Sequence, residues 1–481
     1  MTKYKQIING DDVMFNKNEF SAEEMTIENK PVNFRAYRNL VYVKNPVCPE
    51  YQQMNIFVPE AYYNGESING YNADTAPIFM PNGVGGYMPG KAGEAGLTKD
   101  GRANTILRAL AHGYVVASPA LRGRSLKNEK DENIGKAPAC VIDYKCAVRF
   151  LRLIKDDIPG DTEKIITNGT SAGGALSSLM GATGNHKDYE IYIKEIGGAD
   201  ERDDIFAASC YCPITNLENA DMAYEWQFNG HNECHGMKRN IDENGNVTWE
   251  KHINQMSDVQ IKASNELFSM FPQYLNSLGL KDEEGNVLNL DNDGNGTFKE
   301  YVKGIVRESA QKAVDNKVDI SDKTWIEICD GKVTSIDFDG YVSDITRMKP
   351  SPAFDRLDMD ITENHLFGTT DDDFAHFTKY SVENSLSACK KMADETIIRV
   401  MNPMNYISDK TALTAKHWRI RHGERDRDTS LAISAMLTLK LQNNGCSVDY
   451  HSPWDIPHAG DYDLDELFNW IDTICRIDKK S

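Results

Sequence analysis

The sequence predicts an α/β fold, in which a mostly parallel sheet flanked by helices is interrupted by a large insertion. In the first part of the chain, apolar strand-like runs alternate with helical patterns, as is typical of a parallel sheet covered by helices. The alternation stops near residue 216 and resumes near residue 402. Because the interruption is rich in charge, we interpret it as a unit inserted into one discontinuous core.

Short apolar runs and one helical pattern define the first βαβ unit. The expected strands are residues 54–58, 76–80 and 114–118. Between the last two, residues 104–113 have the apolar spacing of a helix and end in a glycine, a common helix stop. The sheet therefore begins well before the insertion.

Further elements extend the sheet on both sides of the insertion. Before it we expect a helix at 139–154 and strands at 164–168 and 205–213, the last containing Cys210 and Cys212. After it, the expected elements are a strand at 418–422, a helix at 431–442, a strand at 447–453 and a helix at 464–474. We predict a core of residues 1–215 and 402–481 and an inserted lid domain of residues 216–401.

Composition and charge exclude several kinds of partner. Hydrophobic residues make up 40% of the chain and charged residues 26%, which is ordinary for a soluble globular protein. The formal net charge of -20 has the wrong sign for binding nucleic acid or anionic lipid. No run resembles a secretory signal or a membrane span, and the cysteines form no CxxC pair. We expect a cytoplasmic protein with free thiols and no nucleic-acid or membrane partner.

A serine stands between the strand at 164–168 and a following helix, in Gly169-Thr-Ser-Ala-Gly173. In this context a GxSxG pattern forms a strained turn that lifts the serine hydroxyl above the sheet. Such a hydroxyl becomes a nucleophile when a base takes its proton. The pattern predicts an α/β-hydrolase core with Ser171 as nucleophile. The alternative is a glycine-rich helix start that binds nothing or cradles a phosphate.

The acid and the histidine of an α/β-hydrolase follow the serine in that order, on loops after late strands. His458 lies in the loop between the last strand and the last helix. The loop after the preceding strand carries Asp426 and Asp428, and spacing alone does not distinguish them. We choose Asp426, so the expected triad is Ser171, Asp426 and His458.

Acyl transfer also needs hydrogen-bond donors for the developing oxyanion. The peptide N–H of Ala172 is one donor by position. The glycine-rich run 81–90 follows an apolar strand and resembles the oxyanion loop of esterases, so we expect Gly85 or Gly86 to supply the second. A flexible turn is the alternative interpretation.

Five separated motifs resemble those of the bacterial tannases, esterases that release gallic acid from gallate esters. They are Gly169-Thr-Ser-Ala-Gly-Gly174, Lys349-Pro-Ser-Pro-Ala-Phe-Asp355, Glu363-Asn-His-Leu-Phe-Gly368, His422-Gly-Glu-Arg-Asp-Arg-Asp-Thr429 and Pro453-Trp-Asp-Ile-Pro-His-Ala-Gly-Asp-Tyr-Asp463. The resemblance covers nearly the whole chain. It implies the same triad, with Lys349, Glu363 and Asp428 reaching the three ring hydroxyls of a galloyl group. Carboxylates accept hydrogen bonds from such hydroxyls, and an ammonium stabilises their partial negative charge.

The expected substrate is therefore a small phenolic ester, such as methyl gallate or a gallotannin, hydrolysed through an acyl-enzyme. The nearest alternative is a feruloyl or general carboxylesterase with the same triad, and a peptidase is less favoured. A non-catalytic binding protein on a hydrolase core is the alternative from another class. Thr170 and Pro457 stand where the fungal tannase and feruloyl esterase group has cysteines, so we expect no disulfide at the site.

We expect no metal or organic cofactor, and the sequence does not predict an oligomeric state. Asp291, Asp293 and Asn295 match the start of a calcium-binding EF-hand loop. However, Val302 occupies the twelfth position, where a bidentate glutamate is required. We interpret the segment as an Asn/Gly turn and keep calcium binding as a secondary hypothesis.

Overall fold

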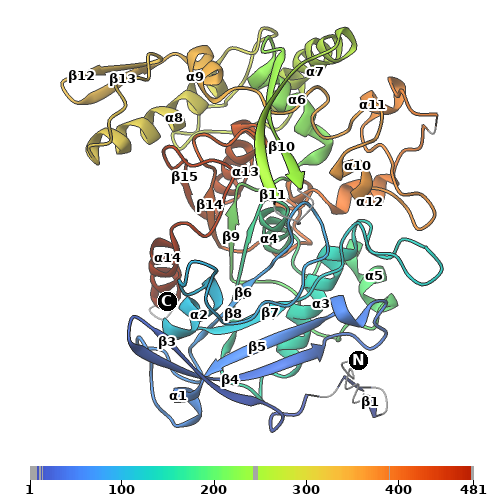
Figure 1. The fold of residues 1–481 in the computed structure, drawn as a ribbon, viewed down its shortest axis with the longest axis vertical. Coiled ribbons are helices and arrows are strands. Elements are labelled where there is room, and N and C mark those ends of the chain that lie inside the picture. The colour runs from blue at the N-terminus through green and yellow to red at the C-terminus, as the bar shows by residue number, and fades with distance from the viewer. Residues whose placement is uncertain (1–7, 10–11, 14, 242–246, 389, 478–481) are drawn as a thin grey trace.

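The computed structural model describes residues 8–9, 12–13, 15–241, 247–388 and 390–477. Its centre is a nine-stranded sheet with the order β15-β14-β9-β8-β6-β7-β5-β4-β3 (Figure 1). The strands from β15 to β7 pair in parallel, and β5, β4 and β3 are added antiparallel at one edge. The sheet is mostly parallel, which confirms the predicted fold class.

The strands of this sheet fall on both sides of a long interruption. They are β3 (Ser21–Ile27), β4 (Lys30–Val41), β5 (Gln53–Pro59), β6 (Pro77–Pro81), β7 (Val115–Pro119), β8 (Asp161–Thr170), β9 (Ala207–Tyr211), β14 (His417–Arg421) and β15 (Ser447–His451). The expected strands between residues 54 and 453 all appear, with ends shifted by a few residues. The β3–β4 hairpin at the edge was not anticipated.

Four neighbouring parallel strands end in register. Thr170 of β8 pairs with Tyr211 of β9, which pairs with Arg421 of β14. Arg421 in turn pairs with His451 of β15. Because parallel strands carry their loops on the same side, the loops that follow these four strands emerge together at one edge of the sheet.

The helices around the sheet include those expected from the sequence. They are α1 (Glu60–Tyr63), α2 (Thr105–Ala111), α3 (Ala139–Leu153), α4 (Ala172–Ala182), α5 (Glu190–Glu195), α13 (Leu431–Asn443) and α14 (Leu464–Ile477). Helix α4 packs on β8 and β9, and α3 packs against α4. All five residues of β9 are buried, as expected for a parallel strand covered on both faces.

Helix α3 is buried on almost every side, and its charged residues are paired. Asp143 accepts a 2.8 Å hydrogen bond from Arg122, and Lys145 lies 2.8 Å from Asp203. Because an unpaired charge in the interior would be costly, these pairs allow α3 to lie inside the molecule.

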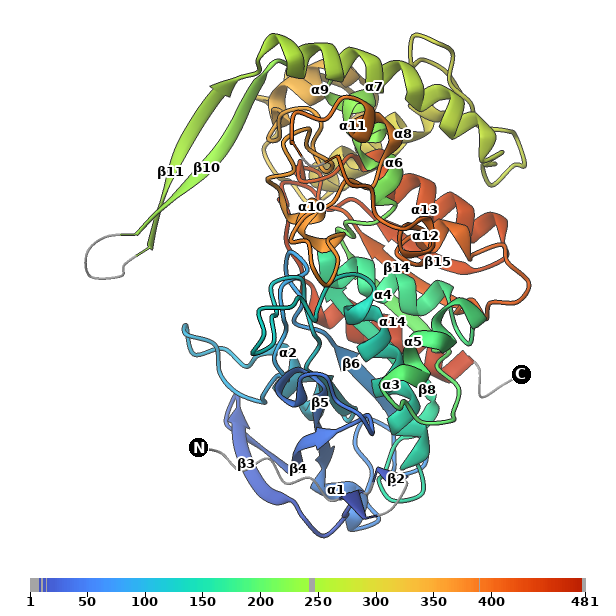
Figure 2. The same cartoon turned by 90° about the vertical axis from the view of Figure 1, so that its right-hand side faces the viewer.

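The residues between β9 and β14 form helices and two hairpins. The helices are α6 (Leu217–Phe228), α7 (Asp258–Ser277), α8 (Thr297–Asp315), α9 (Phe338–Ile345), α10 (Thr362–Leu366), α11 (Lys379–Glu383) and α12 (Glu395–Val400). The hairpins are β10 (Glu233–Ile241) with β11 (Val247–Gln255) and β12 (Ile326–Cys329) with β13 (Lys332–Ile336). Figure 2 shows β10 and β11 projecting away from the rest of the molecule. We expected helices and loops here, so the hairpins are new.

Of residues 216–241, 247–388 and 390–401, none forms a strand of the nine-stranded sheet. Helix α6 nevertheless packs against α13, so this segment contacts the rest of the protein. The domain boundaries near 215 and 402 remain a prediction. Within the described residues, no helix combines the length and the hydrophobicity needed to span a bilayer.

A buried ion pair fixes the chain just before Lys349. The side chains of Arg347 and Glu225 are both fully buried, and Nη1 of Arg347 lies 2.8 Å from Glu225. Glu225 also accepts a 2.5 Å hydrogen bond from Ser264 of α7. Nε of Arg347 donates to the carbonyl of Lys349 at 2.7 Å. The pair therefore joins α6 and α7 to the segment that carries Lys349.

We expect Glu225→Ala to lower the free energy of unfolding by about 3–5 kcal/mol, because it leaves the buried Arg347 guanidinium without a counter-charge. Urea unfolding followed by circular dichroism measures the change. Glu300→Ala is the control, since the Glu300 side chain is 68% exposed, and it should have little effect. Equal stability of the Glu225→Ala and Glu300→Ala proteins would contradict the importance of the buried pair.

Candidate active site

Ser171 occupies a strained turn between β8 and α4. Its φ is 61° and its ψ is -121°, a backbone conformation that is rare for a residue with a side chain. Its N–H donates to the carbonyl of Tyr211 at 3.0 Å, and its own carbonyl accepts the N–H of Ile214 at 3.2 Å. The turn is thus tied to the end of β9, and Ser171 remains partly exposed.

The two glycines of the GxSxG motif allow the backbone segments around Ser171 to approach closely. A Cβ atom on Gly169 would lie 2.3 Å from the carbonyl oxygen of Gly173. A Cβ atom on Gly173 would lie 2.5 Å from Oδ1 of Asn82. Position 169 therefore requires glycine, because the contact is with backbone, whereas a side chain at position 173 would force Asn82 to move.

His458 and Asp426 come together from the loops after β15 and β14. Nδ1 of His458 lies 2.8 Å from Oδ2 of Asp426, whose side chain is fully buried. Oδ1 of Asp426 accepts the N–H of Asp428 at 2.9 Å. The carboxylate of Asp428 lies 4.0 Å from the same imidazole nitrogen. Asp426 therefore holds the hydrogen-bonding position, and Asp428 lies beside it.

The charges of this pair shift both pKa values. Burial lowers the pKa of His458, but the charge of Asp426 and its hydrogen bond raise it by more, so the net shift is upward. Burial raises the pKa of Asp426, and the opposing effects of His458 and His422 give a net decrease. The pair thus favours an ionised Asp426 that orients the imidazole.

Cys212 lies next to Nε2 of His458 and directly follows the strand that anchors the Ser171 turn. The Sγ atom of Cys212 lies 3.9 Å from Nε2 and 3.4 Å from the carbonyl oxygen of Ala459. Cys212 directly follows Tyr211, whose carbonyl binds the Ser171 N–H. In the part of the chain that the structure describes, no hydrogen bond joins the Ser171 hydroxyl to His458. Catalytic hydrogen bonds are often long without substrate and shorten when the substrate binds.

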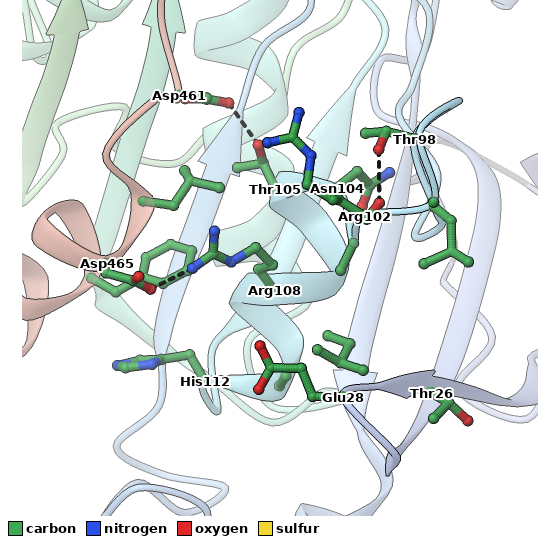
Figure 3. A pocket seen from close by; sticks show the side chains of 17 residues that line it. Thr26, Glu28, Thr98, Arg102, Asn104, Thr105, Arg108, His112, Asp461 and Asp465 are labelled. Atoms are coloured by element: carbon green, nitrogen blue, oxygen red, sulfur yellow. Dashed lines mark hydrogen bonds and ion pairs between the residues drawn. The ribbon is translucent and has the colours of Figure 1, made fainter.

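The loop that carries His458 is anchored to α2 and to the end of β8. Asp461 accepts hydrogen bonds from Thr105 at 2.7 Å and from Asn168 at 2.9 Å. Figure 3 shows Asp461 pointing to Thr105 at the rim of a pocket of about 960 Å³ that α2 and the start of α14 help to line. A Cβ atom on Gly460 would lie 1.8 Å from Oγ1 of Thr170, so the loop rests directly on the end of β8.

The glycine loop after β6 lies beside the start of α4. Nδ2 of Asn82 donates to the carbonyls of Asn168 at 3.1 Å and Gly173 at 3.0 Å. Among the described residues, no protein atom accepts a hydrogen bond from the peptide N–H of Ala172, Gly85 or Gly86. These N–H groups are therefore available, and the choice between Gly85 and Gly86 stays open.

The three residues assigned to ring recognition interact with one another, and one of them, Asp428, lies 4.0 Å from the imidazole. Nζ of Lys349 donates to the carbonyl of Asp428 at 2.6 Å and lies 3.8 Å from its carboxylate. Glu363, on α10, is 6% exposed. Burial raises its pKa, whereas the charges of Lys349 and Arg124 lower it and Asp428 raises it further. The structure thus brings Lys349, Glu363 and Asp428 into one group of ionisable side chains, and Asp428 joins this group to His458.

Two neighbours of this group were missed in the sequence. Nε of Arg124 donates to the carbonyl of Gly86 at 2.9 Å, and its charge acts on Glu363. Cys212 was expected in a buried strand with Cys210, but it lies just beyond β9 and has a φ of 36°. No local pattern marks either residue, because their neighbours belong to distant segments.

The segment that begins at Asp291, for which calcium binding is a secondary hypothesis, forms a hydrogen-bonded turn. Oδ1 of Asp291 accepts the N–H groups of Asp293 at 3.0 Å and Asn295 at 2.9 Å. This is the pattern of an Asx turn. Calcium binding there remains a hypothesis.

A mostly parallel sheet with a strained serine turn and an acid–imidazole pair on its late loops defines an α/β-hydrolase. Residues 84–248 match the BD-FAE family. The tannase of Fusobacterium nucleatum is 50% identical in a solved structure with a TM-score of 0.93, and the match covers 97% of this chain and 100% of that chain. This chain belongs to the tannase family.

Other solved structures support the same family. A tannase from Lactobacillus plantarum is 42% identical with a TM-score of 0.93, and the match covers 96% of this chain and 100% of that one. A tannin acyl hydrolase, also 42% identical with a TM-score of 0.90, has been solved with ethyl gallate, and the match covers 96% of this chain and 99% of that one. A comparison with curated proteins gave no match.

We expect Asp426→Asn to lower the pKa of His458, because the substitution removes the charge that raises it. At a fixed neutral pH the fraction of His458 in the imidazolium form should fall. The imidazole should lose its proton at a lower pH than in the wild type. An NMR pH titration of the imidazole measures this change. Asp455→Asn is the control, because the Asp455 side chain is 74% exposed in the same loop. An unchanged His458 pKa in Asp426→Asn would argue against the pairing.

Proposed function

We propose that this protein is a serine esterase that hydrolyses galloyl esters, such as methyl gallate and gallotannins, through an acyl-enzyme. The observation that carries this proposal is the group of Lys349, Glu363 and Asp428 beside the Asp426–His458 pair. Membership in the tannase family supports it, as does a tannin acyl hydrolase that has been solved with ethyl gallate.

In the proposed reaction, Nε2 of His458 takes the proton of the Ser171 hydroxyl while Ser171 attacks the ester carbonyl. Asp426 accepts the Nδ1–H and keeps the Nε2 lone pair directed at the serine. The N–H of Ala172 and that of Gly85 or Gly86 stabilise the oxyanion. His458 returns the proton to the leaving alcohol, and then activates a water that releases the acid from Ser171. These steps use side chains and peptide groups, so we propose that they need no cofactor.

Ring recognition follows from hydrogen-bond chemistry. A galloyl ring carries three adjacent hydroxyls, and the carboxylates of Glu363 and Asp428 accept hydrogen bonds from such donors. The Lys349 ammonium stabilises negative charge on the ring oxygens. A ring that lacks hydroxyls leaves the buried Glu363 and the partly buried Asp428 without these donors, and the resulting penalty gives the site its selectivity.

We further propose that the two predicted domains divide these tasks. Residues 1–215 and 402–481 supply the triad, the oxyanion donors and Asp428. The inserted residues 216–401 supply Lys349 and Glu363. The hydrogen bond from Lys349 to the Asp428 carbonyl joins the two contributions.

Replacing the nucleophile tests the reaction. We expect Ser171→Ala to reduce kcat for methyl gallate by roughly 10³-fold or more, because no acyl-enzyme can form. Release of gallic acid, followed by liquid chromatography, measures the rate. Ser178→Ala in helix α4, which follows Ser171, should retain most activity. A Ser171→Ala protein as active as the wild type would favour a different nucleophile or a non-catalytic binding protein.

Replacing Glu363 tests the substrate class. The wild type should prefer methyl gallate to methyl protocatechuate and methyl ferulate in kcat/KM. Glu363→Gln should lower the value for methyl gallate by roughly 10- to 100-fold and that for methyl ferulate much less, because it removes a charged acceptor for a ring hydroxyl. Thermal melts check folding.

The matched control for that experiment is Glu218→Gln, another glutamate of the inserted segment, which accepts a 2.9 Å hydrogen bond from Asn402. It should leave the ratio of the two esters unchanged. A wild-type protein that prefers methyl ferulate would replace the galloyl assignment with a feruloyl esterase and leave the triad intact.

A further inference from the structure

We infer that Cys212 and His458 form a binding site for a soft divalent cation such as Zn²⁺ or Cd²⁺, which inhibits the enzyme by occupying the catalytic imidazole. The inhibition rests on the proposed function of His458, because a cation on Nε2 prevents this atom from taking the serine proton. The binding itself rests only on the geometry of the site.

The distance between the two ligand atoms suits a shared metal ion. Sγ of Cys212 lies 3.9 Å from Nε2 of His458. With a Zn–S bond of about 2.3 Å and a Zn–N bond of about 2.0–2.1 Å, this separation corresponds to an S–Zn–N angle of roughly 125°. A small adjustment reaches the tetrahedral value. Thiolate and imidazole are also the ligands that zinc prefers.

Asp426 prepares the imidazole as a ligand. Its carboxylate accepts the Nδ1–H of His458 at 2.8 Å, which leaves the lone pair on Nε2 directed at Cys212. Such a carboxylate behind a metal-binding histidine orients the ring and raises its basicity. Ligand atoms of Cys212, His458 and Asp426 all lie within 4.8 Å of one another. The hydrogen bond that prepares His458 as a base therefore also prepares it for a metal.

A cation can reach this pair from the substrate side. The His458 side chain is 20% exposed, and Ser171 is partly exposed. Cys212 itself is buried, and its thiol points to the carbonyl of Ala459. On binding, the S–H bond of Cys212 and the Nε2–H bond of the imidazolium form of His458 break, their protons pass to solvent, and bonds from Sγ and Nε2 to the metal form. Water fills the remaining positions of the metal.

The other cysteines that the structure describes offer no comparable group. Among the described residues, Cys212, Asp426 and His458 are the one cluster of three or more possible ligands. Cys329 is exposed, so it serves as a control for unspecific binding through an accessible thiol.

Inhibition is measured with a nitrophenyl ester, because the adjacent hydroxyls of gallates themselves bind metal ions. We expect Zn²⁺ to inhibit the wild type and chelator to restore the rate. Cys212→Ser and Cys212→Ala should raise the half-inhibiting Zn²⁺ concentration at least tenfold, each relative to its own uninhibited rate. Cys329→Ser should behave as the wild type. Equal Zn²⁺ sensitivity of the wild type and a folded Cys212 variant would overturn the inference.

Cobalt binding provides a readout that needs no activity. Co²⁺ added to the wild type or to Ser171→Ala should give the near-ultraviolet absorbance of a thiolate–cobalt bond. Cys212→Ser and His458→Gln should lose that absorbance. If it persists in Cys212→Ser, or is absent from the wild type, the metal site is wrong.

The two readouts separate the failure of this inference from the failure of the proposed function. A wild type that binds Co²⁺ through Cys212 but hydrolyses none of the esters would contradict the esterase assignment alone. A wild type that hydrolyses the esters but shows no thiolate–cobalt absorbance would contradict the metal site alone.

Discussion

The hydrogen bond between Asp426 and His458 is the interaction on which the rest of the site depends. This bond joins the loops that follow β14 and β15. The two groups lie 2.8 Å apart, and the side chain of Asp426 is completely buried. A buried carboxylate is costly unless it is paired, so the histidine loop has to close over it. Asp461 and Gly460 then hold that loop on α2 and β8. The pair therefore fixes where the imidazole lies relative to the Ser171 turn.

The sheet brings these groups together because β8, β9, β14 and β15 are neighbours that end in register. The loops after them carry Ser171, Cys212, Asp426 and His458 in the same order. Parallel strands place such loops at a common edge, which is why residues far apart in the chain meet here. Cys212 follows β9, which lies between β8 and β14. It therefore emerges at the same edge of the sheet as Ser171 and Asp426.

Local signals explain what the sequence predicted and what it did not. The GxSxG turn, the strands on both sides of the insertion and the order of acid and histidine are encoded in short segments, and these were found. The β10–β11 hairpin was missed because residues 233–255 are largely polar and lack a clear apolar alternation. Asp426 could not be separated from Asp428 by spacing, since only the folded loops show which carboxylate reaches Nδ1. Arg124 approaches Glu363 only after folding.

In the proposed function, Asp428 connects acid–base chemistry with ring recognition. Its N–H binds Asp426, its carbonyl binds Lys349, and its carboxylate lies 4.0 Å from the catalytic imidazole. A ring hydroxyl that binds Asp428 therefore acts on the same short loop that orients His458. Because binding energy from remote parts of a substrate can position the reacting groups, the proposal implies that a substrate without this hydroxyl loses turnover as well as affinity. In the proposed arrangement, the segment 426–428 contributes to the selectivity for the acyl group through Asp428 and to the rate of its transfer through Asp426.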